Sequence, residues 1–499
     1  MAEVITSYLP AIAVLAPFLV GIMLYYIGRR SERARDIVSI ATCVVSFLAV
    51  AAMAPTILGG KVIEFILVSG EVAPIEIAFR VDKLSLIIAM MCSFEWILAT
   101  VYSIRYMSHE HARNRYYTFM LLTLGSVLGV LLTKNLFSLF IFFELMLLTS
   151  YVLVIHEETP AAMKAGRLYL FLGIGTGLVL FLAIVTTYMM AGTLDLGLGG
   201  ILEYQGTISY LVFIAFLIGA MTKAGIFPFH LWLPVAHPIA PSPASAILSG
   251  VLVKEGCYLM IRVIYDVFGV DLVAAMGVHV PLAILAGFTM LFGSAVAIKQ
   301  TNLKTMLGYS TVGQMGYIFL GMSLLTITGL QGAIVHILHH AMMKGALFLT
   351  AGAIIYKTGI REIGEMAGIG KKMPMTMLVF TIAAISMIGI PPLCGFISKW
   401  VLAMGALETG APVFMIFIVV LILSSIMNAA YFMPIIINAF FGEEDHGKGD
   451  HGKKVEYGDV PVSMLVPMVI LALGVIIFGI FTNISFSVIV PAVNALFGA

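Results

Sequence analysis

The ionisable residues with the most informative spacing in this sequence are lysines, histidines and glutamates inside long apolar runs. Glu144 lies in the middle of one such run, and Lys223 lies in another, a few residues before two prolines. His336, His340 and Lys344 recur every four residues, so a helix would place all three on one face. Side chains of these types accept and release protons, and burial and neighbouring charges set how readily they do so. The pattern therefore favours proton transfer between buried groups.

Further ionisable residues also fall inside apolar runs: Lys254, Lys399, Arg262, Glu95 and Glu255. A charge at the centre of a membrane-spanning helix costs about 2.5–3.5 kcal/mol. Summed over the buried lysines, glutamates and the arginine, this cost is on the order of 20 kcal/mol, above the net stability of a typical protein. These groups must therefore pair with one another, bind water or backbone atoms, or lose their charge.

A structural role is the alternative for each of these residues, as an ion pair that only stabilises the fold. Arg262 lies near the end of its run with Asp266 close by, and we expect its long side chain to reach the water interface. Glu255 points about 100° away from the preceding lysine around a helix, so its role is open, as is that of Glu95. His339 faces away from the histidine–lysine stripe and is expected in the core.

Composition indicates that lipid is the main solvent of the chain. Of its 499 residues, 61% are hydrophobic and 11% are charged, and the mean hydropathy is +1.08. Soluble proteins carry roughly 25% charged residues, so this chain lacks the polar surface that water requires. Its 27 basic and 26 acidic residues balance, which gives no indication of nucleic acid as a partner. The cysteines stand singly, without the paired spacing of metal or redox centres: Cys43, Cys92, Cys257 and Cys394.

Apolar windows of about 20 residues predict an all-α polytopic membrane protein with about fourteen transmembrane helices. Alternating apolar and polar residues predict a small hairpin over 59–82 on the outer surface. The connections are short, so no sizeable soluble domain is expected. The predicted spans are 5–27, 36–58, 84–104, 116–133, 135–155, 165–190, 209–235, 243–265, 273–298, 304–325, 330–356, 374–404, 411–441 and 461–483.

Charge in the connecting loops predicts the orientation of the chain. The first apolar run, Ile5–Ile27, is too long for the core of a signal peptide, and its basic cluster follows the run, so we expect a retained span. Most basic residues fall in the odd-numbered loops, and the even-numbered loops hold only Lys61, Arg80, Lys83 and Lys134. Because cytoplasmic loops collect Lys and Arg, this predicts a protein of the cell membrane with both termini on the outer side.

Prolines and glycines interrupt the seventh and twelfth predicted spans, which carry Lys223 and Lys399. Broken helices at membrane depth line hydrated cavities and ion sites, and their paired placement is typical of inverted repeats. We therefore predict two inverted five-helix repeats, spans 4–8 and spans 9–13. The chain then divides into spans 1–3 with the hairpin, the two repeats, and a cytoplasmic loop with span 14: 1–112, 113–268, 269–441 and 442–499.

Nearly the whole chain resembles the antiporter-like membrane subunits that Mrp-type sodium/proton antiporters, respiratory complex I and membrane-bound hydrogenases share. The resemblance is specific because its motifs occur in the right order at the right spans. Over Ala236–Ala246 the chain is most similar to members found in hydrogenase and formate hydrogenlyase complexes. The sequence ends soon after span 14, and in this respect it resembles the D-type subunit of Mrp antiporters. The motifs are Thr222–Pro234, Ser249–Lys254, Leu307–Tyr317, His336–Lys344 and Pro391–Lys399.

This resemblance implies roles for the buried residues. In the first half it implies a glutamate–lysine pair and a connecting lysine, here Glu144, Lys223 and Lys254. In the second half it implies a histidine/lysine relay that ends at a lysine on the second broken helix, here His336, His340, Lys344 and Lys399. The sequence departs from the family pattern near the cytoplasmic ends, which puts proton uptake there in question: Val235 replaces an acid, and Asn302 and Thr305 replace the common Asp and Arg.

Three functions are open at this stage. The first is a proton- or cation-translocating subunit of a redox-driven complex, related to membrane-bound hydrogenase or complex I, with H+ and then Na+ as the candidate ions. The second is the D-type subunit of a Mrp-type antiporter without a redox partner, and the third is a non-conducting scaffold. Each implies other membrane subunits and the lipid bilayer as partners. No cofactor and no metal is expected in this chain, and we interpret His446 and His451 as solvated residues of loop 442–460.

Overall fold

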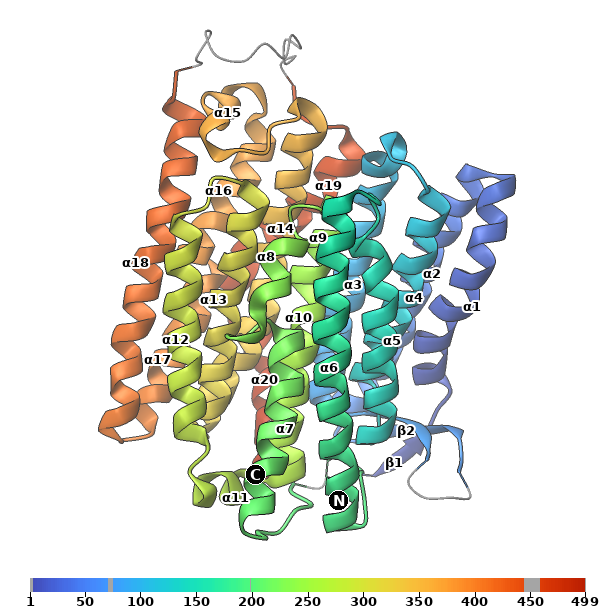
Figure 1. The fold of residues 1–499 in the computed structure, drawn as a ribbon, viewed down its shortest axis with the longest axis vertical. Coiled ribbons are helices and arrows are strands. Elements are labelled where there is room, and N and C mark those ends of the chain that lie inside the picture. Colours follow the sequence, from blue (N-terminus) through green and yellow to red (C-terminus); the bar gives the residue numbers. More distant parts are fainter. Residues whose placement is uncertain (1–2, 71–74, 198, 444–457, 499) are drawn as a thin grey trace.

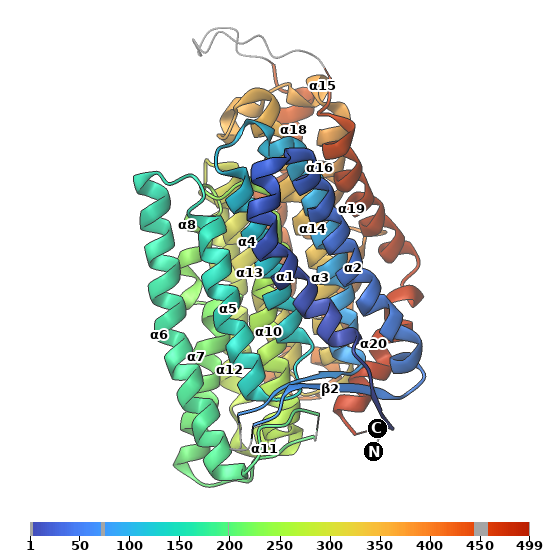
Figure 2. The ribbon, with the colours of Figure 1, turned by 90° about the vertical axis from the view of Figure 1, so that its right-hand side faces the viewer.

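The structure, a computed structural model, describes residues 3–70, 75–197, 199–443 and 458–498. It is mostly helical, and the long helices run side by side (Figure 1). The first and last described residues lie at the same end of this bundle in both views (Figures 1 and 2). The loop histidines His446 and His451 lie outside the described residues.

The N-terminal region consists of three long helices and a small sheet. In chain order these are β1 (Val4–Thr6), α1 (Leu9–Arg30), α2 (Glu32–Leu58), β2 (Val62–Val68), β3 (Ile77–Val81) and α3 (Lys83–Tyr106). Strands β2 and β3 pair in antiparallel fashion, so the predicted hairpin is present. Strand β1 pairs in parallel with β2. The first residues of the predicted span 5–27 therefore belong to the sheet, because β2 satisfies their backbone hydrogen bonds.

The next region contains the first broken helix. Its helices are α4 (Arg113–Leu131), α5 (Leu136–Val154), α6 (Pro160–Ala191), α7 (Thr207–Ala224), α8 (Trp232–Ala236), α9 (Ser242–Ile247) and α10 (Val253–Arg262). After α7, Gly225 adopts a φ of +72°, which favours glycine, and ends the helix. Two π-helical turns, Leu248–Leu252 and Val263–Phe268, flank α10. Such turns widen the helix and occur frequently at functional sites.

The remaining region contains the second broken helix. Its helices are α11 (Val270–Met276), α12 (His279–Ile298), α13 (Leu303–Ser323), α14 (Ile327–Thr358), α15 (Ile369–Lys372), α16 (Pro374–Ile388), α17 (Cys394–Glu408), α18 (Pro412–Phe441), α19 (Val462–Ile480) and α20 (Asn483–Leu496). The predicted span 374–404 is divided between α16 and α17, where Gly389 adopts a φ of +94°. Helix α20 was not among the predicted elements.

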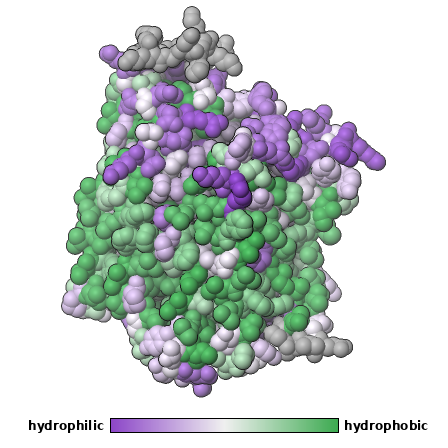
Figure 3. All heavy atoms as spheres, viewed as in Figure 1, coloured by the Kyte–Doolittle hydropathy of each residue, from purple (hydrophilic) through white to green (hydrophobic). Residues whose placement is uncertain are grey.

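Ten of the described helical segments are long and apolar enough to cross a membrane. A broad apolar band covers the face in Figure 3, and hydrophilic residues gather at the end opposite the sheet. This distribution is that of a membrane protein. The predicted spans 243–265 and 374–404 are divided into shorter helices, so they do not appear among the ten.

Helix α14 lies at the centre of the bundle. In its most apolar stretch 89% of the residues are buried, the highest share among the ten segments. It packs against α3, α13, α16, α17 and α19. A helix in this position has no lipid to face, so its polar residues must be satisfied by the surrounding helices.

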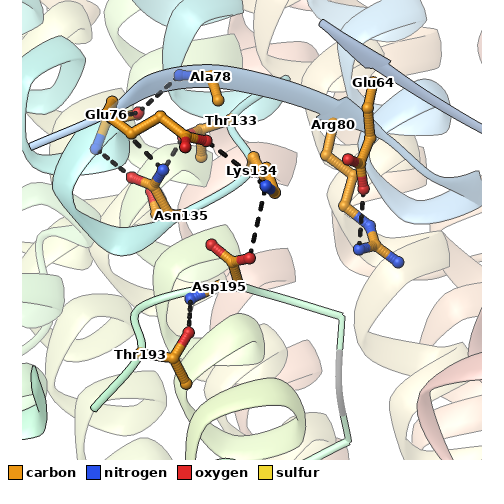
Figure 4. Close-up of polar contacts among 10 residues, drawn as sticks. Glu64, Glu76, Ala78, Arg80, Thr133, Lys134, Asn135, Thr193 and Asp195 are labelled. Atoms are coloured by element: carbon orange, nitrogen blue, oxygen red, sulfur yellow. Dashed lines mark hydrogen bonds and ion pairs between the residues drawn. The ribbon is translucent and has the colours of Figure 1, made fainter. Parts of the chain in front are cut away.

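An ion-pair network fastens the sheet to the helix connections beside it (Figure 4). Lys134, between α4 and α5, lies 3.4 Å from Glu76 before β3 and 3.5 Å from Asp195 after α6. Arg80 and Glu64 pair across β2 and β3 at 3.1 Å. Lys134 therefore joins three connections that are distant in sequence.

We predict that Lys134→Ala lowers the stability of the protein by about 1 kcal/mol, because two partly exposed ion pairs are lost together. The thermal unfolding midpoint of the detergent-purified protein measures this effect. Lys61→Ala is the matched control, since the Lys61–Glu3 pair is more exposed, and it should leave the midpoint unchanged. Equal midpoints for the two variants would show that the network does not stabilise the fold.

Candidate functional site

The first broken helix places Lys223 at the end of α7. Beyond Gly225, the Trp232 indole donates to the carbonyl of Thr222 at 2.7 Å, one of the carbonyls that the helix end leaves free. Lys223 is buried, and its Nζ donates to the carbonyl of Phe143 at 3.4 Å and lies 4.9 Å from the centre of that ring. The lysine therefore extends from the break toward α5.

Glu144 follows Phe143 on α5 and is half-buried. Its carboxylate lies against Gly177 of α6, where a Cβ would contact it, and Oε1 has no hydrogen-bond partner in the part of the chain that the structure describes. Among the described residues, no ion pair within 4.0 Å joins Glu144 to Lys223, although the two charges interact electrostatically. The predicted pair is therefore close but not in contact.

Lys254 on α10 contacts the second half of the chain directly. Its Nζ lies 2.7 Å from Nδ1 of His340 on α14, and it donates to the carbonyl of Ser249 at 2.5 Å. That carbonyl belongs to the π-helical turn before α10. Lys254 and His340 are both fully buried, so this contact joins the two halves without solvent.

The histidines of α14 lie in a row, as their spacing predicts. The ring centres of His336 and His340 are 5.8 Å apart. His336 stacks on Tyr317 of α13 with ring centres 5.2 Å apart, and its Nδ1 lies 2.9 Å from Ser398 Oγ on α17. The row therefore extends from the contact with α10 to the second broken helix.

Lys344 continues the stripe one turn further along α14. Its Nζ donates to the carbonyl of Leu307 and to Oγ of Ser310, both at 2.9 Å and both on α13. Lys344 is fully buried, so these oxygens and the phenyl ring of Phe348 replace water around its ammonium group.

Lys399 on α17 turns back across the second break. Its Nζ donates to the carbonyls of Met387 and Ile388 at 2.8 and 2.9 Å, and to Ser425 Oγ at 3.0 Å. Those carbonyls end α16 and have no partner within the helix. The negative end of the α16 dipole also favours a cation at this place.

A polar chain through α18 joins the Lys344 site to the Lys399 site. The hydroxyl of Tyr431 lies 2.9 Å from Ser310 Oγ and 2.8 Å from Asn428 Oδ1. Asn428 Nδ2 donates to the carbonyl of Met387 at 3.2 Å, which is also an acceptor for the lysine of the second break. Tyr431 and Asn428 were not among the site residues predicted from the sequence. Their spacing could have indicated them, because they are polar residues three positions apart in the apolar span 411–441.

Glu95 and Glu255, whose roles the sequence left open, lie beside Lys254. Both are buried, and their charges interact with that lysine. Within the described ranges, neither oxygen of Glu95 has a hydrogen-bond partner, nor does Oε2 of Glu255. Gly250 and Gly345 make room for the Glu95 carboxylate, because a Cβ at either position would contact it. The two carboxyl groups therefore lie where the two halves meet.

The expectation for Arg262 was wrong. Its side chain is 3% exposed and does not reach the water interface. Instead it pairs with Asp82 at 2.6 Å and with Asp266 at 2.7 Å, and it donates to the hydroxyl of Tyr258 at 3.0 Å. Two carboxylates within reach make burial more favourable than extension to the interface.

Sequence reasoning also missed Lys304, at the boundary of the predicted span 304–325. It is buried, and its Nζ donates to the carbonyl of Ala240 at 2.5 Å. It lines a cavity of about 380 Å³ together with Glu110, Glu157 and Arg361.

The remaining predictions concern core residues. His339 is buried beside Phe478, with ring centres 6.4 Å apart. All four cysteines are buried and free. These positions agree with the structural roles expected for them.

Comparison with known proteins identifies relatives along the whole chain. Residues 133–425 match the family model described as NADH:quinone oxidoreductase/Mrp antiporter, TM, and residues 68–117 match the N-terminus of complex I chain 5. NADH-quinone oxidoreductase subunit N of Desulforudis audaxviator is 34% identical, over 96% of this chain and 97% of that protein. The D-type subunit of the Na(+)/H(+) antiporter of Alkalihalophilus pseudofirmus is 31% identical, over 92% of both. A chain of the Mrp complex from Dietzia has the same fold, with a TM-score of 0.87, 24% identity and 98% of each chain covered.

We predict that Arg262→Ala destabilises the protein by about 3 kcal/mol, because Asp266 would remain buried without its partner. Arg113→Ala is a control, since its partner Glu32 is exposed, and it should cost less than about 1 kcal/mol. Unfolding midpoints of the two purified variants provide the comparison. A side chain that extended to water would give equally small changes in both, which would contradict the buried ion pair.

Proposed function

Because this chain belongs to the NADH:quinone oxidoreductase/Mrp antiporter family of membrane subunits, we propose that it moves protons along its buried lysines and histidines. It is an ion-translocating, antiporter-like subunit of a multisubunit membrane complex. The proposed route begins at Glu144 and Lys223, continues through Lys254, and passes His340, His336 and Lys344 to Lys399.

The contact between Lys254 and His340 carries this proposal. It joins α10 to α14 through two groups that can each hold or release a proton, 2.7 Å apart and without solvent exposure. A proton on one nitrogen is within hydrogen-bond reach of the other. A purely structural contact would not require two proton-exchanging groups at the point where the two halves meet.

Electrostatic coupling allows one half to influence the other. At an effective dielectric constant of about 20, two charges roughly 8 Å apart interact by about 2 kcal/mol. One pKa unit corresponds to about 1.4 kcal/mol, so a proton gained at one site changes the occupancy of the next. Movement of Glu144 relative to Lys223 would then load or release the first proton. Water molecules would connect Lys223 to Lys254, since no direct hydrogen bond joins them in the described part of the chain.

The finer architecture is part of this proposal. We propose fourteen spans, with inverted repeats over 113–268 and 269–441 between the flanking regions 1–112 and 442–499. The glycine breaks after α7 and α16, each close to a lysine, support this division. Both termini would lie on the outer side, since they share one end of the bundle and basic residues gather in the loops of the other.

A redox-driven complex is the first candidate for the assembly, and a Mrp-type antiporter is the second. The 34% identity to a NADH-quinone oxidoreductase subunit supports the first, and the 31% identity to a D-type antiporter subunit supports the second. Protons are the proposed ion in both cases, with sodium exchanged for them in the second. The polar contacts of the α14 stripe with α10, α13 and α17 favour either candidate over a non-conducting scaffold.

We predict that Lys254→Met lowers ion transport at least tenfold while the complex still assembles, because the contact with His340 is lost. Transport is measured with a pH-sensitive dye in inside-out membrane vesicles, and assembly by the subunits that co-purify. Lys164→Met on the exposed face of α6 is the control and should transport at the wild-type rate. Wild-type transport by the assembled Lys254 variant would support the scaffold instead.

We also predict that Tyr431→Phe slows transport about fivefold, equivalent to the loss of one hydrogen bond of about 1 kcal/mol. The substitution removes only the hydroxyl between Ser310 and Asn428. Tyr265→Phe removes a hydroxyl of similar burial that donates to Met322 outside the proposed route, so it should leave the rate unchanged. An equal effect of both substitutions would exclude Tyr431 from the route.

Co-purification also separates the two candidate complexes. If the first is correct, affinity purification of the tagged full-length chain from its native membrane should recover iron–sulfur or nickel–iron subunits. Recovery of antiporter-like subunits alone would identify the second.

A further inference from the structure

A carboxylate and two imidazoles meet at the end of the bundle opposite the sheet. Glu110 and His111 lie in the connection between α3 and α4, and His156 lies in the connection between α5 and α6. One possible ligand atom from each residue lies within 4.8 Å of the others. We propose that Glu110, His111 and His156 bind a divalent transition-metal ion such as Zn2+. None of these residues belongs to the proposed transport route.

His156 is the observation that points to a ligand. Its side chain is 0% exposed, and neither ring nitrogen has a hydrogen bond of ordinary geometry among the described residues; the ring has only a weaker polar contact with the backbone of His111. Leaving a buried polar group unsatisfied is unfavourable, and a metal ion would satisfy one of these nitrogens. The ring is held in place by stacking on His111, with ring centres 5.0 Å apart, and by the edge of Tyr116 at 5.5 Å.

Arg115 is the neighbouring cation that acts most strongly on His156. Arg115 itself is engaged by the carboxylate of Glu158 and by the carbonyl of His156, which reduces its repulsion of a cation.

The geometry requires only small adjustments. Zinc–nitrogen and zinc–oxygen bonds of about 2.0–2.2 Å in a tetrahedron place the ligand atoms roughly 3.4 Å apart. His111 is exposed and Glu110 is half-buried, so rotation of these side chains can bring their atoms closer to the buried imidazole. Two imidazoles and one carboxylate suit zinc, nickel or copper better than calcium or magnesium, which prefer oxygen ligands. Water would complete the tetrahedron.

A bound ion would also affect the cavity beside it. Glu110 and Lys304 both line the 380 Å³ cavity, so ligation would engage one of its carboxylates. It would also link the α3–α4 connection to the α5–α6 connection. If the cavity takes up protons, the ion should slow transport. This consequence rests on the proposed function, whereas metal binding itself does not.

Equilibrium dialysis of the detergent-purified complex against Zn2+ tests the site. All variants carry His446→Ala and His451→Ala, so that loop 442–460 contributes no imidazole. We expect one Zn2+ per chain in this background, and at least about tenfold weaker binding for His111→Ala and for Glu110→Gln. His109→Ala is the matched control, because His109 is a neighbouring exposed histidine outside the group, and it should bind as the background does.

His111 is exposed and Glu110 is half-buried, so their variants keep the test valid if substitution of buried His156 impairs folding. Cobalt in place of zinc adds a second readout, because a tetrahedral site with two imidazoles gives visible absorption that His111→Ala should abolish. The proposal is overturned if the background complex binds no Zn2+ at this site, or if binding is unchanged by both Glu110→Gln and His111→Ala. If the background complex binds Zn2+ but transports at the same rate with and without it, the site stands and only its proposed effect on the cavity is removed.

Discussion

The structure depends on one constraint: an ammonium group in the membrane interior must have oxygen or nitrogen atoms around it in place of water. Each lysine of the proposed route meets this constraint with a main-chain carbonyl. Lys223 uses Phe143, Lys254 uses Ser249, Lys344 uses Leu307, and Lys399 uses Met387 and Ile388. A carbonyl accepts a hydrogen bond without carrying a full charge, so the lysine is held in place whether or not it is protonated.

The interruptions in the helices follow from this requirement. A regular helix uses its carbonyls internally, whereas the end of α16 leaves the carbonyls of Met387 and Ile388 free for Lys399. The π-helical turn before α10 presents Ser249 to Lys254. The broken helix and the widened turn therefore supply the carbonyls for Lys399 and Lys254. Lys223 and Lys344 instead use carbonyls within the regular helices α5 and α13. Carboxyl groups also lie near two of these lysines: Glu144 near Lys223, and Glu95 and Glu255 near Lys254.

Much of the fold and the site was predictable because apolar length and residue type are local properties. The central helix was predicted over 330–356 and extends over Ile327–Thr358, and the row of His336, His340 and Lys344 follows from helical spacing alone. Helix α20 was missed because it is short, and β1 because its backbone pairs with a strand far away in sequence. The membership of the chain in its family was also readable from the motifs.

The sequence by itself determined that the chain is a membrane protein and which of its segments are apolar enough to cross the bilayer. It also determined which charged residues need polar contacts inside the membrane. Those conclusions follow from composition and periodicity, which do not depend on the neighbours of a residue. Only the tertiary structure decided which partner each charge has: that Lys254 meets His340, that Arg262 is buried between two aspartates, and that Tyr431 and Asn428 connect two lysine sites. The physical reason is that contacts between helices depend on how each helix is rotated and inclined against the others, and packing of the whole bundle sets those angles.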